Sequence, residues 1–375
     1  MSYLITSRAL LAGSAPKVAD QIADTIVDYA LSYDPDARID CKCMWDKNTI
    51  TIAGNIAALT GHQIPYMSIA QQVLNFVGYG DAGITYNVSM APYQAELFAS
   101  VAPDTPIATG LAVGYATNET PSYLPLGQKL ANDISVIMFS EYSGHKIEWM
   151  KSDGECQITL RYEDDGEKIV DSLMVLAQHR YDYTLKQIVP GVTKVCNMAL
   201  ANTKVDPNVK YYINPTGTFI NGGSKRSIGM SGTHPASDMY GLYCPIGDSP
   251  TGKDPSYVGR FGNYYARYVC KNIVASGACD KMALKLAYIP SLPEPASIAF
   301  NCYGTEKVSL AEIDKAINNF FNYKSTNIIN QFGLKKKIKY LNYSCFGQMG
   351  RLELDSPWEK LDKVDTLKEF FKKEN

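Results

Sequence analysis

The feature that most constrains this fold is a repeated order in which a long amphipathic helix is followed by two strands. In the first round, Val18, Ile22 and Ile26 recur at helical spacing, and aspartates occupy another face. The predicted rounds comprise helices over 17–33, 124–139 and 263–277, each followed by a strand pair: 37–43 and 49–56, 156–162 and 168–179, 282–289 and 296–303. A sheet buries its apolar face by packing helices against it, so three rounds predict an α+β protein of three similar sheet-plus-helix domains.

Further helices are expected outside these rounds. One covers 66–78, and a second covers 309–323, where Ser309 and Glu312 have the spacing of a capping box. A charged amphipathic helix is expected over 359–374. From these elements we predict an N-terminal domain at 3–100, a central domain at 105–222, a C-terminal domain at 223–362 and a helical tail at 363–375.

Composition and charge exclude several classes of protein. Lys and Arg number 36 against 38 Asp and Glu, so the net charge of −2 argues against nucleic-acid binding by bulk positive charge. No apolar run reaches the roughly 18 residues of a membrane span. The nine cysteines are scattered without a CxxC pair, and there are only four histidines, so we expect buried thiols in a reducing cytoplasm and no metal site. The 26 tyrosines favour self-association, because Tyr forms large amphipathic contacts at interfaces, although tyrosines also fill ordinary cores and surfaces.

Eight short phrases, in order along nearly the whole chain, resemble the S-adenosylmethionine synthetase (methionine adenosyltransferase) family. They are KVADQIAD at 17–24, GYATNET at 114–120, INPTG at 213–217, GKDPS at 252–256, YYARYVCKNIVASG at 264–277, EPASI at 294–298, YGTEKV at 303–308 and PWEK at 357–360. The resemblance implies three α+β domains in a pseudo-threefold arrangement, in a dimer whose active sites lie between two chains. It also implies a reaction in which the methionine sulfur attacks C5′ of ATP, with Mg²⁺, K⁺ and a ring of basic side chains around the triphosphate.

At the positions where that family carries its chemistry, this chain departs from it. The family's EGHPDK signature reads Ala12-Gly13-Ser14-Ala15-Pro16-Lys17, so a catalytic histidine becomes Ser14 and a metal-binding aspartate becomes Pro16. A further metal-binding aspartate becomes Gly259, and the potassium-coordinating glutamate becomes Lys42. The other family positions with a changed residue are Asn55, Ala108, Glu155, Ser227, Thr233 and Tyr257. The resemblance therefore implies that most metal carboxylates and phosphate cations are missing, and that neither Mg²⁺ nor K⁺ is a cofactor.

Four polar residues remain as candidates for binding a ligand: Lys17, Lys253, Asp254 and His234. The leading hypothesis is a catalytically inactive homologue with a structural role, which assembles from dimers or tetramers into a filament or lattice. One alternative is a regulatory subunit that pairs with an active synthetase. The others are a divergent enzyme that acts on ATP and methionine, or on another nucleoside with His234 and Lys253 as acid and base. In each case we expect at least a homodimer.

Overall fold

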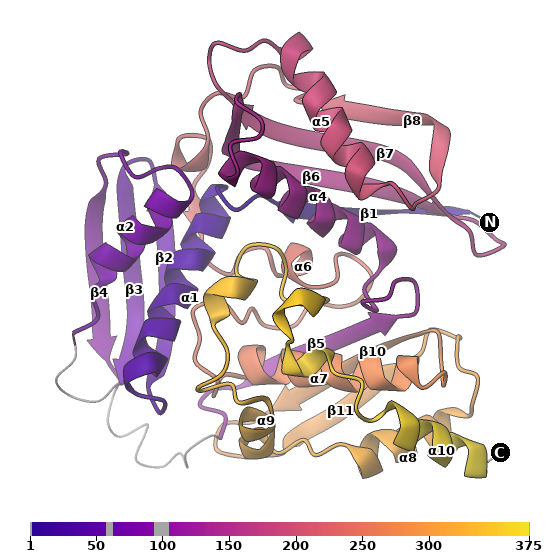
Figure 1. Cartoon of the computed structure of the whole chain (residues 1–375). Coiled ribbons are helices and arrows are strands. Elements are labelled where there is room, and N and C mark those ends of the chain that lie inside the picture. Colours follow the sequence, from indigo (N-terminus) through magenta and orange to yellow (C-terminus); the bar gives the residue numbers. More distant parts are fainter. Residues whose placement is uncertain (1, 58–62, 94–104, 375) are drawn as a thin grey trace.

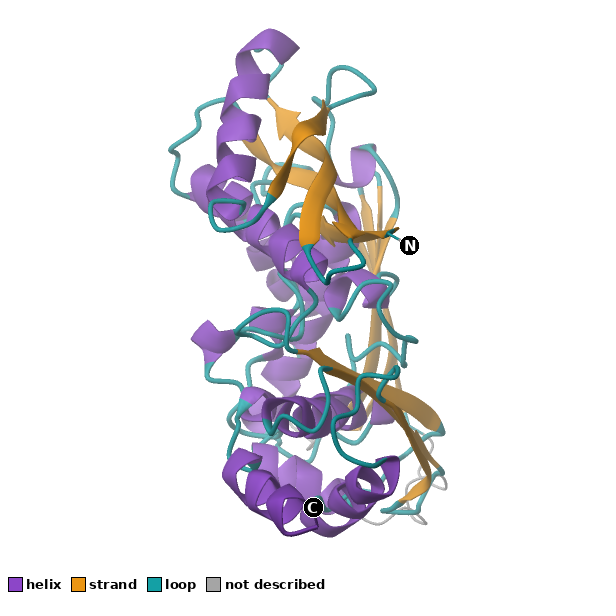
Figure 2. Ribbon diagram, turned by 90° about the vertical axis from the view of Figure 1, so that its right-hand side faces the viewer, coloured by secondary structure: helices purple, strands orange, loops and turns teal. Residues whose placement is uncertain are grey.

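The computed structural model describes residues 2–57, 63–93 and 105–374, which form three sheets, each covered by helices on one face (Figure 1). Seen from the side, most helices gather on one side of the molecule, and two of the sheets lie toward the other (Figure 2). This confirms an α+β protein of three sheet-plus-helix units.

The first sheet has the strand order β4–β3–β2–β9. Its strands are β2 (Arg38–Asp46), β3 (Thr49–Ala57), β4 (Thr85–Pro92) and the short β9 (Gly229–Met230). Helix α1 (Ala15–Tyr33) packs on β2, and α2 (Tyr66–Phe76) packs on α1. The predicted helical stripe of Val18, Ile22 and Ile26 is completely buried here, so the hydrophobic pattern fixes which face of α1 meets the sheet.

The second sheet has the order β1–β6–β7–β8. It consists of β1 (Tyr3–Leu10), β6 (Met150–Tyr162), β7 (Lys168–His179) and β8 (Val205–Ile213), with helices α4 (Leu126–Ser143) and α5 (Leu185–Ala199). The third sheet, β11–β10–β5, consists of β5 (Gly110–Thr117), β10 (Lys281–Tyr288) and β11 (Pro295–Asn301). Its helices are α7 (Val258–Ala275), α8 (Leu310–Phe320), α9 (Ser325–Phe332) and α10 (Val364–Glu374). Short helices complete the chain: η1 (Gly223–Lys225), α6 (Pro235–Asp238), η2 (Tyr340–Tyr343), η3 (Leu352–Leu354) and η4 (Pro357–Glu359).

The sheets do not follow the predicted sequence ranges, because each one takes a strand from a neighbouring range. Strand β1, from the range 3–100, pairs with β6 over eight residues. Strand β5, from the range 105–222, pairs with β10, and β9, from the range 223–362, pairs with β2. The domain ranges therefore remain a prediction. The folded units do not coincide with them, because each sheet includes one strand that comes from the sequence range of a neighbouring unit. The boundary expected between 100 and 105 lies outside the described residues.

The structure also adds an element that the predicted rounds lack. In the first two units the hairpin continues through a helix into a parallel strand, giving β3–α2–β4 and β7–α5–β8. All nine cysteines are free thiols, and all except the half-buried Cys244 are buried, as expected. Among the described residues, no helix combines the length and apolar character needed to cross a membrane.

Candidate functional site

The start of α1 carries two of the changed family positions, and both act as parts of a helix terminus. Ser14 is the N-cap residue, it is buried, and its hydroxyl donates to the carbonyl oxygen of Leu11 at 2.8 Å. Pro16 lies in the first helical turn, where a missing backbone N–H costs no hydrogen bond. Gly229 of β9 packs directly on this turn, and a Cβ there would be 2.1 Å from the carbonyl oxygen of Ala15. These residues close the end of the helix and offer neither a titrating group nor a metal ligand.

Lys17 is buried between two carboxylates of the same chain, which neutralise its positive charge inside the protein. Its Nζ donates to Asp20 Oδ2 at 3.0 Å and makes a shorter contact with Asp238, which lies 221 residues away in α6. All three side chains are almost completely buried. Burial opposes the ammonium charge, but attraction to Asp238 and Asp20 outweighs it and raises the pKa of Lys17. Burial also raises the pKa of Asp20 to about 7. We refer to Lys17, Asp20 and Asp238 as the Lys17 network.

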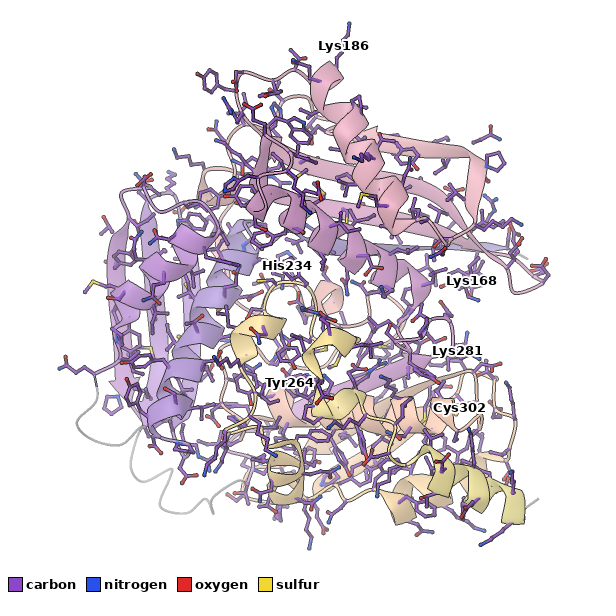
Figure 3. All side chains as sticks on the ribbon, viewed as in Figure 1. Lys168, Lys186, His234, Tyr264, Lys281 and Cys302 are labelled. Atoms are coloured by element: carbon purple, nitrogen blue, oxygen red, sulfur yellow. The ribbon has the colours of Figure 1, made fainter. Side chains whose placement is uncertain are left out.

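His234 lies near this network, at the N-cap of α6 in the middle of the molecule (Figure 3). Its Nδ1 is 3.0 Å from the hydroxyl of Thr233, which is itself exposed and donates to the carbonyl oxygen of Met230. Desolvation lowers the pKa of His234, with opposing contributions from Asp238 and Glu155 and further lowering by Arg8 and Lys17. The imidazole is therefore biased toward the neutral form, and it faces a pair of basic and acidic side chains that already neutralise each other.

That pair is Arg8 and Glu155, on the paired strands β1 and β6. Arg8 Nη2 donates to Glu155 Oε2 at 2.7 Å, and Arg226 Nη2 lies 3.9 Å from the same oxygen. Glu155, which stands where the family has a lysine, thus occupies two arginines that could otherwise attract an anion. The sequence contained no signal for either arginine, because their partners lie in distant segments.

A second group lies on β2 and the loop before α7. Lys42 Nζ is 3.9 Å from Asp40 Oδ1, and Asp40 forms a backbone bridge with Lys253. The ammonium of Lys253 lies 5.6 Å from the ring centroid of Tyr257, and desolvation lowers its pKa. Asn55 pairs with Asp40 across the strands and is exposed. Lysine 42 therefore stands beside a carboxylate, in keeping with an ammonium that takes the place of a bound cation.

Gly232 connects the two groups. Its N–H donates to Asp20 Oδ1 at 2.7 Å, and a Cβ on it would lie 3.9 Å from Lys42 Nζ. The structure thus brings Lys17 and Lys42 to two sides of one glycine. Ala108 and Ser227 make no such contribution: Ala108 lies half-buried in the bend before β5, and Ser227 is exposed after η1.

Asp254 and Gly259 have become structural parts of the α7 start. Asp254 is fully buried and accepts hydrogen bonds from the N–H groups of Ile39 and Ser256 at 2.7 Å each, and from the Ser256 hydroxyl at 2.6 Å. Gly259 lies under the preceding loop, where a Cβ would be 2.8 Å from the carbonyl oxygen of Ser249 and 2.9 Å from that of Asp248. A carboxylate at 259 has no room in this arrangement.

These residues do not fit the magnesium ions that the resemblance implies. Mg²⁺ prefers octahedral oxygen ligands, and neither Pro16 nor Gly259 has an oxygen in its side chain. In the part of the chain that the structure describes, no three His, Cys, Asp or Glu side chains converge as a metal site would require.

Comparisons with known proteins define the family. The three domain models of S-adenosylmethionine synthetase match successive parts of the chain. The N-terminal domain matches residues 2–113, the central domain matches 107–219 and the C-terminal domain matches 221–360. The S-adenosylmethionine synthase of Sulfurovum sp. NBC37-1 is 33% identical over 98% of both chains, and that of Helicobacter pylori J99 is 32% identical over 99% of both. The synthase of Staphylococcus epidermidis RP62A is 34% identical over 98% of this chain and 97% of its own. This chain therefore belongs to the S-adenosylmethionine synthetase family.

Asp153 provides a test of the electrostatics around this site. Its Oδ2 accepts the N–H of Gly223 at 2.8 Å, its Oδ1 is buried without a hydrogen-bond partner, and Arg226 lies 3.8 Å away. Burial raises its pKa from 3.8 to about 7, so the folded state binds its proton more tightly than the unfolded state. The ionised group therefore destabilises the fold above pH 7, and this cost disappears as the pH falls toward 4.

We expect Asp153→Asn to stabilise the protein at pH 8 by roughly 1–3 kcal/mol and to have little effect at pH 5. A pKa raised by three units corresponds to a cost of roughly 4 kcal/mol for keeping the aspartate ionised in the folded state, and Asn removes this cost. The amide N–H that takes the place of Oδ1 is buried without a partner, and this reduces the gain by about 1–3 kcal/mol. The nearby Arg226 keeps Glu155 as a partner in the variant. Urea unfolding at the two pH values measures the difference, and an equal effect at both would contradict the assignment.

Proposed function

We propose that this chain is a catalytically inactive member of the S-adenosylmethionine synthetase family with a structural role, which self-assembles from dimers. The observation that carries the proposal is the Lys17 network. In a site that holds a triphosphate, a retained lysine must present its ammonium to the ligand. Here two buried carboxylates of the same chain take up that charge.

The other changed positions support the same conclusion. Glu155 adds a negative charge and occupies Arg8 and Arg226. Removal of one preorganised group that stabilises transition-state charge costs about 3 kcal/mol, or roughly 10²-fold in rate. Several such groups are replaced here together with the metal ligands, so the losses together exceed what a merely divergent enzyme could tolerate.

The test of inactivity is incubation of the purified protein with ATP, methionine, Mg²⁺ and K⁺. We expect no S-adenosylmethionine and no release of triphosphate, at a detection limit at least 10³-fold below a family synthetase assayed in parallel. Turnover within tenfold of that synthetase would overturn the proposal. Activity that appears only after the synthetase is mixed with this chain, above that of the synthetase alone, would instead favour a regulatory subunit.

The exposed face of the first sheet supports self-assembly. Helices cover one face of this sheet. The opposite face mixes small, apolar and polar side chains, in cross-strand rows such as Met230–Met44–Thr51–Asn87 and Lys42–Ala53–Ser89. Met44 is 40% and Met230 is 49% exposed. Small side chains allow a second sheet to approach closely, and exposed methionines adapt to a partner surface. We therefore propose that this face joins two copies, and that larger assemblies such as filaments grow from the dimer.

We expect a dimer at sub-micromolar concentration without nucleotide or metal, measured by light scattering. Ala53→Arg should convert it into a folded monomer, because a long cation would stand in the centre of the face. Ala201→Arg, in the exposed loop after α5, is the matched control and should leave the dimer intact. A wild-type monomer, or a dimer that forms only with ATP, would contradict this part of the proposal.

A further inference from the structure

We propose that a cavity lined by none of the family positions named above binds an anion that carries a planar ring and has the size of a nucleoside monophosphate. The cavity has a volume of about 430 Å³ and is lined by the β2–β3 turn, the loop after α2, the ends of β6 and β7, and the segment 220–225. None of the retained or changed family positions lines it. Its volume lies in the range of small-molecule sites, which is about 300–1,000 Å³.

The charges of the lining favour an anion. The cationic side chains are those of Lys47, Lys151, Lys225 and Arg180, and the lining contains a single carboxylate, that of Asp81. Arg180 is already paired, with Asp182 at 2.8 Å and Glu148 at 3.1 Å. No carboxylate of a described residue lies within ion-pair distance of the three lysines. Three uncompensated ammonium groups around one concavity focus a positive potential into it and attract anions.

The wall of the cavity favours a flat ring. Trp45 is 2% exposed, and its ring makes an edge contact with Tyr79 at 5.1 Å between centroids. The indole N–H of Trp45 is buried and has no acceptor among the described residues. That N–H is closed off from the cavity, whereas Tyr79 lines the cavity and is only half-buried, so its ring is the one that a flat molecule can contact.

The remaining polar groups of the wall hold the cavity open and rigid. The Gln178 Oε1 accepts from the hydroxyl of Tyr79 at 3.2 Å, and its Nε2 donates to the carbonyl oxygen of Ile220 at 2.9 Å. The hydroxyl of Ser224 donates to the carbonyl oxygen of Lys47 at 2.5 Å. These bonds fix the lining segments to one another before any ligand arrives, which lowers the ordering cost of binding. The three lysines and the exposed amides of Asn48 and Asn221 remain as the groups that can adapt to a ligand.

The experiment is calorimetry of the full chain with AMP and UMP as probes, in EDTA at low salt, with adenosine and inorganic phosphate as separate arms. We expect both nucleotides to bind in the range of tens of micromolar, and each half-molecule to bind at least tenfold more weakly. The variant Lys47→Gln, Lys151→Gln, Lys225→Gln should weaken nucleotide binding at least tenfold. The control variant changes three exposed lysines elsewhere on the surface and should bind the nucleotides as the wild type does: Lys186→Gln, Lys210→Gln, Lys336→Gln. Lys186 points outward at the start of α5 (Figure 3).

Absence of saturable binding up to millimolar nucleotide would overturn the inference. Binding that the triple cavity variant leaves unchanged, or that depends on Mg²⁺, would overturn it as well, because either result would place the nucleotide elsewhere. The inference does not depend on the inactivity of the family site, since turnover is measured in a different assay.

Discussion

Replacement of Lys17 by methionine should lower the free energy of unfolding by about 3–5 kcal/mol. Removing one partner of a buried ion pair leaves an uncompensated buried charge, and losses of this size are typical. In this chain two carboxylates, Asp20 and Asp238, would be left without their cation. Chemical denaturation at pH 7.5 measures the change. A matched surface lysine, Lys129 of α4, pairs with Asp133 and has its side chain 35% exposed, and Lys129→Met should change stability by less than about 1 kcal/mol.

The triple variant Lys17→Met, Asp20→Asn, Asp238→Asn removes the charges together and should recover most of the loss, since only the unpaired charges cost so much. If Lys17 instead served a bound anion, Lys17→Met would leave stability nearly unchanged in the absence of ligand. That result would contradict the structural role of the Lys17 network and weaken the proposed inactivity with it.

Gly259→Asp, which restores the residue type of the family, should destabilise the protein by about 1–3 kcal/mol and should not restore Mg²⁺ binding. A glycine-to-alanine change within a helix normally stabilises it by about 1 kcal/mol. Here the added Cβ meets two backbone carbonyl oxygens at 2.8 and 2.9 Å, and overpacking of this kind costs about 1–3 kcal/mol. Steric strain therefore outweighs helix propensity, and an aspartate adds a second carboxylate beside Asp248.

Gly259→Ala separates the steric part of the effect from the charge. We expect Gly259→Ala to be less stable than the wild type, and Gly259→Asp to be less stable than Gly259→Ala. Thermal unfolding with and without Mg²⁺ is the measurement. A stable Gly259→Asp protein whose melting temperature rises with Mg²⁺ would show that the loop over α7 yields and that a metal site can be rebuilt.

Local sequence patterns predicted those parts of the fold in which hydrophobic periodicity and turn signals agree. Helix α1 and strand β7 are examples, with observed bounds close to the expected ones, whereas β6 begins at Met150, six residues before the strand expected at 156–162. Helix α5 was not predicted, because Pro190 and Gly191 interrupt its sequence; the capping-box spacing of Thr184 and Gln187 was the signal that could have located its start. Strand β1 was not expected either, since its partner β6 begins about 140 residues later.

The candidate site shows the same division between local and distant information. Motif positions indicated that Ser14, Pro16 and Gly259 depart from the family. The sequence did not indicate what replaces the lost interactions, because Lys17 finds Asp238 and Glu155 finds Arg8 only after folding. The close passage of the Asp248–Ser249 loop over Gly259 was equally unpredictable, since it depends on the packing of α7 against that loop.

The cyclic exchange of β1, β5 and β9 has a consequence for how this molecule comes apart. Each unit completes its sheet with a strand that another unit's sequence supplies, so a fragment cut at any predicted boundary lacks a strand and carries a stray one. Exposed sheet edges of that kind promote aggregation. Each of the three units therefore depends on a strand from another unit, and unfolding of one unit removes a strand from the sheet of the next. We therefore expect the three units to unfold in one cooperative step, so that no unit opens while the other two stay folded.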